Sequence, residues 1–219
     1  MYVIKILANE MDEFLKQICR CREINYRLVE RQAISNKEQC AVAFRRNNEF
    51  YITVVSGDER GVKIPIAEEE SKNIIREHGV EHAEAVYYDH THPEKSFAIP
   101  NAFDLTAADI TTRKGKRPVH AVTCYTLGSG IEKLIYQRKE VPNVFSRIAS
   151  YVSNKTGWKR PFHKRFEKNV MERARNAKTS RELLSIIKEE LERTGKYNAD
   201  FVIINKDVKI PKSFKKYSF

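Results

Sequence analysis

Two histidines and a nearby carboxylate form the arrangement in this 219-residue chain that is best suited to chemistry. His90 and His92 are separated by one residue, and Asp104 follows twelve positions after His92. Residues i and i+2 of an extended segment point the same way, so both imidazoles can face one point, and a turn can return Asp104 to it. Two His and one carboxylate, with the fourth position open to water, suit catalytic zinc, which lowers the pKa of bound water to about 7. The spacing therefore predicts one zinc ion.

A strand and a helix are predicted around these residues. The apolar run 84–88 is typical of a buried strand that leads into the two histidines, and Pro93 would end it. Asp104 would begin a helix over residues 104–112 that ends near Gly115. A carboxylate at a helix N-terminus is held on a rigid element, and its negative charge suits the helix dipole.

The motifs resemble the signature of the JAMM, or MPN-plus, zinc metallopeptidases, in which a distant Glu precedes H-x-H-P and then S-x-x-D. Residues 90–93 read His-Thr-His-Pro, and residues 100–104 read Pro-Asn-Ala-Phe-Asp, with Asn101 in place of the Ser and a loop that is one residue longer than the family's. Glu38 begins Glu-Gln-Cys-Ala, similar to the family's E-x-C-G with Ala for Gly. The resemblance covers roughly residues 2–138, and three motif pieces in order are more specific than one.

The resemblance implies metal-assisted hydrolysis of an amide bond. His90, His92 and Asp104 would bind one zinc ion, and Glu38 would act as general base and then as general acid. Asn101 would take the place of the family Ser and donate a hydrogen bond to the developing oxyanion. The simpler alternative makes Glu38 a solvated charge before a strand and Asn101 an ordinary turn residue.

Two other zinc chemistries are disfavoured. Residues 78–82 read His-Gly-Val-Glu-His and match H-x-x-E-H, but Gly79 is expected to end the helix over 68–77, and that motif requires an unbroken helix. The H-x-E and P-C-x-x-C motifs of the zinc deaminases are absent from the sequence, which argues against deamination.

The composition favours an intracellular protein. The four cysteines form no C-x-x-C pair, which is typical of a reducing compartment and argues against a disulfide framework. No run of 18 apolar residues is present, and the first residues lack the pattern of a signal peptide. We expect a cytoplasmic protein without a membrane span.

Hydrophobic patterns along residues 1–140 predict an α/β fold, a mixed β-sheet flanked by helices, as in the JAMM/MPN and cytidine-deaminase-like sandwich. Helices are expected near 11–18, 68–77 and 104–112. Strands are expected at 2–7, 26–34 and 84–88, and in two hairpins, 40–44 with 50–55 and 119–126 with 131–137 across the turn 127–130.

The positive charge is confined to the C-terminal part. Residues 1–140 contain 21 Lys and Arg and 21 Asp and Glu, whereas residues 141–219 contain 19 and 8, the whole net charge of +11. We therefore expect a metallopeptidase domain, 1–140, and a basic, mainly helical extension, 141–219, that supplies no zinc ligand. Helices are expected around Phe145–Val152, over 162–177 and from a capping box at Thr179, followed by a strand at 201–204 and a basic aromatic tail, 212–219.

Three roles remain open for the extension. Basic residues close to Trp158 and Phe162 could grip a phosphate backbone: Lys159, Arg160, Lys164, Arg165 and Lys168. They could equally bind an acidic partner protein, or form a solvated cap.

Together these features predict an intracellular zinc-dependent peptidase or isopeptidase, a deubiquitinase-like hydrolase. By resemblance, its substrate would be a ubiquitin-like or sulfur-carrier protein cleaved at its C-terminal glycine. The alternative is a catalytically weak MPN-like module that binds nucleic acid or an acidic partner through its basic C-terminal helices.

Overall fold

The computed structural model describes residues 2–58, 61–92, 98–126 and 130–204. Within these residues the chain forms seven strands and seven helices, and the predicted α/β class is confirmed. The strands are β1 (Ile4–Leu7), β2 (Gln39–Arg46), β3 (Glu49–Ser56), β4 (Glu84–Thr91), β5 (Val119–Thr126), β6 (Gly130–Arg138) and β7 (Tyr197–Ile204). The helices are α1 (Met11–Arg20), α2 (Arg22–Ser35), α3 (Ile64–Glu77), α4 (Ala102–Thr111), α5 (Val144–Thr156), α6 (Pro161–Ala174) and α7 (Ser180–Arg193).

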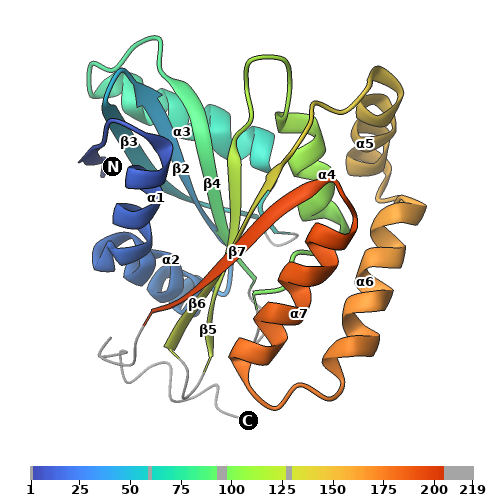
Figure 1. The fold of residues 1–219 in the computed structure, drawn as a ribbon. Coiled ribbons are helices and arrows are strands. Elements are labelled where there is room, and N and C mark those ends of the chain that lie inside the picture. The colour runs from blue at the N-terminus through green and yellow to red at the C-terminus, as the bar shows by residue number, and fades with distance from the viewer. Residues whose placement is uncertain (1, 59–60, 93–97, 127–129, 205–219) are drawn as a thin grey trace. The chain divides into compact units, whose positions relative to one another are not determined.

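The strands form a mixed sheet in the order β1-β3-β2-β4-β5-β6-β7 (Figure 1). β2 pairs with β3 as an antiparallel hairpin, and β2 also pairs antiparallel with β4. In the second register Cys40 lies opposite His90. This pairing joins the segment that follows Glu38 to the strand that carries the histidines.

The chain forms two compact units that do not follow its sequence order. Among the described residues, the first contains 2–58, 61–92, 98, 121–126, 130–133 and 202–204, and the second contains 99–120 and 134–201. The boundary predicted at residue 140 therefore falls inside the second unit. The physical reason is that α4 packs against α5 and α6, so a segment of the predicted enzyme domain belongs with the extension.

An aromatic core holds the first unit together. The ring of Phe14 on α1 stacks on that of Phe50 on β3 with centroids 4.1 Å apart, and it meets the edge of Tyr87 on β4 at 5.7 Å. α2 and α3 also pack on these strands, and α3 lies behind them in Figure 1. Burial of these large rings makes β4 a rigid support.

The strand predicted over residues 26–34 is wrong, because this segment belongs to α2. Its buried residues Ile24, Leu28 and Val29 follow a helical spacing, and Glu23 pairs with Arg27 one turn later. The β-branched residues of the segment suggested a strand. The charged residues among them fit the solvent-facing side of a helix better than alternation along a strand.

Helices dominate the second unit. α4 packs against α5 and α6, and α6 packs against α7 (Figure 1). The Thr179 side chain caps α7 as predicted, by accepting a hydrogen bond from the Glu182 backbone N–H at 3.2 Å. The apolar residues on the inner side of α7 are all buried, namely Leu183, Leu184, Ile187 and Leu191.

Three predicted features lie outside the described residues. They are Pro93, which was expected to end β4, the turn residues 127–129 and the tail 212–219. The H-x-x-E-H segment is not helical, because α3 ends at Glu77 and Gly79 adopts a φ of +76°. Within the described residues, no helix is both long enough and apolar enough to span a lipid bilayer.

Candidate metal centre

The two imidazoles face each other at the C-terminal end of β4. His90 and His92 are 4% and 5% exposed, and their Nε2 atoms lie 3.1 Å apart. Two nitrogen ligands at 2.0–2.1 Å from a tetrahedral zinc are separated by about 3.3 Å. The spacing of the two Nε2 atoms therefore suits chelation of one ion as well as a direct hydrogen bond between the rings.

Neighbouring elements hold the backbone of this segment. The Gln32 side chain on α2 donates a hydrogen bond to the carbonyl oxygen of His92 at 2.8 Å. The backbone N–H of Gln39 donates to the hydroxyl of Thr91, the residue between the two histidines, at 2.9 Å. Both contacts fix the extended conformation that turns the two rings to the same side.

A buried polar network lies on the opposite face of β4. Asp89 forms an ion pair with Lys133 on β6, both fully buried, and accepts a hydrogen bond from Thr123 at 2.6 Å. Tyr87 donates to the same carboxylate at 3.0 Å, and burial together with Asp89 raises the pKa of Tyr87, so its hydroxyl stays protonated. Such satisfied networks rigidify a core. Here the network anchors the strand directly beneath the histidines.

Glu38 enters the same region through the β2–β4 register. Glu38 directly precedes β2 and lies two residues before Cys40, which is opposite His90 in this register. Its Oε2 accepts a hydrogen bond from the Val62 backbone N–H at 2.7 Å. Gly61 has a φ of +111°, and a Cβ there would lie 2.8 Å from that oxygen, so only glycine leaves the carboxylate its place.

Cys40 is the neighbour of His90 across the two strands. It is fully buried, and burial together with Asp89 and Glu38 raises the pKa of its thiol well above the usual value. The thiolate, which is the form that binds metals, is therefore disfavoured. Cys40 is therefore a small core residue.

In the second unit, Asn101 and Asp104 form a capping box at the start of α4. The Asn101 Oδ1 accepts hydrogen bonds from the backbone N–H groups of Phe103 and Asp104, at 2.7 and 3.2 Å. Asp104 Oδ2 accepts from the Asn101 backbone N–H at 2.6 Å. The cap thus holds the Asp104 carboxylate on the first turn of α4.

α6 supplies a second acceptor to the same helix end. Glu167 Oε1 accepts a hydrogen bond from the backbone N–H of Ala102, the first residue of α4, at 2.7 Å. Lys159 forms an ion pair with the other oxygen of Glu167 at 3.0 Å. Two carboxylates therefore satisfy N–H groups at a helix N-terminus, where negative charge is favoured.

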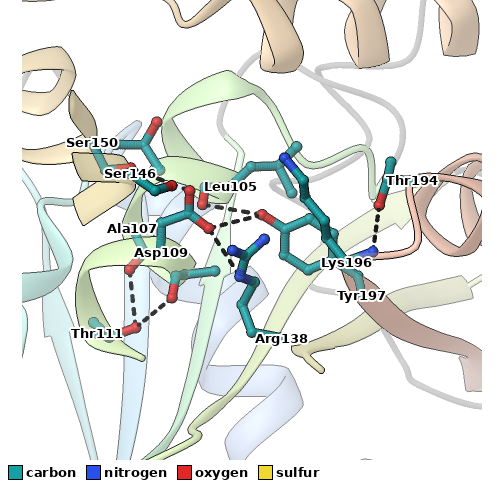
Figure 2. Close-up of polar contacts among 12 residues, drawn as sticks. Leu105, Ala107, Asp109, Thr111, Arg138, Ser146, Ser150, Thr194, Lys196 and Tyr197 are labelled. Atoms are coloured by element: carbon teal, nitrogen blue, oxygen red, sulfur yellow. Dashed lines mark hydrogen bonds and ion pairs between the residues drawn. The ribbon is translucent and has the colours of Figure 1, made fainter. Parts of the chain in front are cut away.

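Asp109 lies on α4 five residues after Asp104, and it joins the helix to the rest of the second unit (Figure 2). Its carboxylate binds Arg160 at 2.7 Å and Arg138 at 3.2 Å, and it accepts hydrogen bonds from Ser150 at 3.2 Å and Tyr197 at 3.3 Å. Arg160 is therefore a structural residue. The sequence had allowed it a place on an exposed basic surface, which the structure does not bear out.

Among the residues that the structure describes, one group of His, Cys, Asp and Glu side chains could hold a metal ion, and it consists of His90, His92 and Asp104. One ligand atom from each lies within 4.8 Å of the others. These are the three residues that the sequence predicts as ligands. Two nitrogens and one carboxylate oxygen, largely removed from solvent, fit zinc.

The metal is not identified by likeness to known proteins. No protein-family model and no curated protein matches the chain. The assignment to zinc therefore depends on the donor atoms and on the motifs in the sequence.

Sequence reasoning did not identify the residues that support the ligands. Glu167 lies 63 positions after Asp104, and Gln32 lies 60 positions before His92, so no local pattern connects either pair. Gly61 offered a weak signal, because a glycine within a polar loop often marks a close approach of the backbone to another group.

Proposed function

We propose that the protein is a zinc-dependent peptidase or isopeptidase that hydrolyses an amide bond. The observation that carries this proposal is the grouping of His90, His92 and Asp104, each with one ligand atom within 4.8 Å of the others. The order of the motifs around these residues resembles the JAMM metallopeptidases and supports the same chemistry. By that resemblance, the bond cleaved would follow the C-terminal glycine of a ubiquitin-like or sulfur-carrier protein.

The residues present divide into binding and proton-transfer roles. His90 and His92 would bind the ion through their Nε2 atoms, and Asp104 would bind it through one carboxylate oxygen. A zinc ion held by this set would supply Lewis acidity and would lower the pKa of water at its open position to about 7.

Glu38 would carry the proton from water to the leaving nitrogen. Its place two residues before Cys40, the register partner of His90, supports this role, and its Oε2 accepts a hydrogen bond from the Val62 backbone N–H. A general base that becomes a general acid contributes about 10²–10⁴ in rate. Asn101 would donate to the oxyanion through Nδ2, because its Oδ1 is occupied by the cap.

The proposal is tested by hydrolysis of a ubiquitin-like protein fused through its C-terminal glycine to a fluorogenic amine. The wild-type protein should release the amine, a chelator should stop the release, and added zinc should restore it. His78→Ala is a matched control, because it removes a histidine outside the group. Release that continues in His92→Ala at the wild-type rate would rule out this site as the catalytic centre.

A further inference from the structure

The outward face of α5 is apolar. Phe145 and Ile148 are 84% and 56% exposed, and the other large apolar residues of the helix are exposed as well, namely Val144, Tyr151 and Val152. They recur every three or four positions and so form one stripe. The stripe extends over about 12 Å from Val144 to Val152.

Polar contacts fix this orientation of α5. The residues buried on its inner side are Ser150 and Ser153. Ser150 donates a hydrogen bond to Asp109 on α4 at 3.2 Å, and Ser153 donates to the carbonyl oxygen of Trp158 at 2.5 Å. The helix therefore packs through its hydroxyl side and presents its apolar side to solvent.

A contiguous apolar stripe of this kind is typical of an interaction surface. Of the large apolar side chains that are exposed within the described residues, more than half lie between Val141 and Trp158. The remainder are scattered over other elements. The concentration on a single helix and its flanks is what distinguishes α5.

The charge around the stripe indicates the chemistry of its partner. Residues 141–166 contain six Lys and Arg and no Asp or Glu. Lys159 and Arg160 are paired with Glu167 and Asp109, whereas the other four are exposed, with Arg147 and Lys155 on α5 itself. A second α5 would bring the same charge and would be repelled. Residues 205–219 contain five Lys and one Asp, so their net charge is also positive and would be repelled by the basic residues around the stripe. The surface thus favours an acidic partner.

The mixture of side chains indicates the form of that partner. Single-stranded nucleic acid stacks on aromatic rings, whereas Val144, Ile148 and Val152 are aliphatic. A straight row of aliphatic and aromatic side chains on a helix packs well against the ridges of another helix. We propose that the exposed face of α5 binds an acidic amphipathic helix of a partner protein, which covers Phe145 and Ile148.

The test uses the full-length protein and a labelled synthetic helix of three heptads, with Leu at the core positions and Glu elsewhere. Fluorescence anisotropy should show binding, and the double substitution Phe145→Ala, Ile148→Ala should weaken it by at least about 10-fold. Met171→Ala is the matched control, because Met171 is 62% exposed on α6, and it should bind as wild type does. A peptide with Lys in place of Glu should not bind.

Four results would overturn the proposal. They are absence of binding by the wild-type protein, equal binding by the double variant, equal binding of the Lys peptide, and self-association that the double variant abolishes, which would assign the face to a second copy. Phe145-dependent binding of phosphatidylserine vesicles or of a single-stranded oligonucleotide, without peptide binding, would assign it to those ligands. Circular dichroism should confirm that the variants fold, since both substituted residues are exposed.

Discussion

The Glu167 carboxylate on α6 accepts a hydrogen bond of 2.7 Å from the backbone N–H of Ala102, two residues before the candidate metal ligand Asp104. The extension thus supports the N-terminus of the helix that carries this ligand. Residues 141–219 supply none of the candidate ligands, yet removing them would strip α4 of Glu167, Arg160 and Ser150. A fragment of residues 1–140 should therefore bind metal more weakly than the full chain.

Glu167→Ala should weaken zinc binding by about 10-fold or more, the range typical of residues that orient metal ligands. The loss of a carboxylate acceptor at the N-terminus of α4 should also speed hydrogen exchange of the Ala102 amide. This exchange rate can be measured on metal-free protein, so it reports the Glu167–Ala102 contact independently of zinc. Glu172→Gln is the control, because Glu172 on the same helix pairs with Lys168 at an exposed site. Equal zinc affinity in Glu167→Ala, with faster exchange, would limit this residue to a structural role.

Glu38→Gln should lower the rate of amide hydrolysis by about 10²–10⁴, because Gln cannot accept the proton from water. The variant should retain zinc at the wild-type stoichiometry, since Glu38 is outside the ligand group. Rate and bound metal should be measured on the same preparation. Simultaneous loss of both would show that Glu38 holds the site together and does not transfer protons.

Substitutions of Asn101 separate its two roles. Asn101→Ala should remove the cap of α4, which costs about 1 kcal/mol of stability, and should lower kcat by about 10²–10³ if Nδ2 stabilises the oxyanion. Asn101→Ser keeps a capping oxygen and a donor, so it should be tolerated in both respects. Asn101→Asp keeps the cap and loses the donor, and wild-type kcat in this variant would eliminate the oxyanion role.

His163 should make stability depend on pH. Burial and the nearby cations Arg160, Lys196 and Arg138 lower its pKa from 6.5 to about 3. Because the unfolded state binds a proton at a higher pH than the folded state, the free energy of unfolding should fall as the pH drops below 6.5. The contribution lost between pH 7 and pH 5 is about 2 kcal/mol.

This loss is measured as a difference between the wild-type protein and His163→Gln, both treated with chelator, in denaturant titrations at the two pH values. The subtraction cancels the titration of other histidines and carboxylates. An identical dependence on pH in both proteins would mean that His163 has the same pKa in the folded and unfolded states.

Local patterns predicted most of the elements that carry the site. The apolar run before His90 and the helix that follows Asn101 both form, since each was set by neighbours in sequence. The α2 segment was misread, because its β-branched residues outweighed a helical spacing of charges that is visible only over several turns. The contact of Glu167 with Ala102 and the outward face of α5 depend on tertiary packing, which no local pattern encodes.

Elemental analysis of protein purified without added metal decides whether His90, His92 and Asp104 hold one zinc ion. The wild-type protein should contain one zinc per chain, and the zinc should be lost in His90→Ala and in His92→Ala. Asp104→Ala should bind zinc much more weakly, and the control His78→Ala should bind it as wild type does. A folded wild-type protein that neither contains zinc nor takes it up on addition, or a His92→Ala variant with a full complement of zinc, would show that these residues do not form a zinc site.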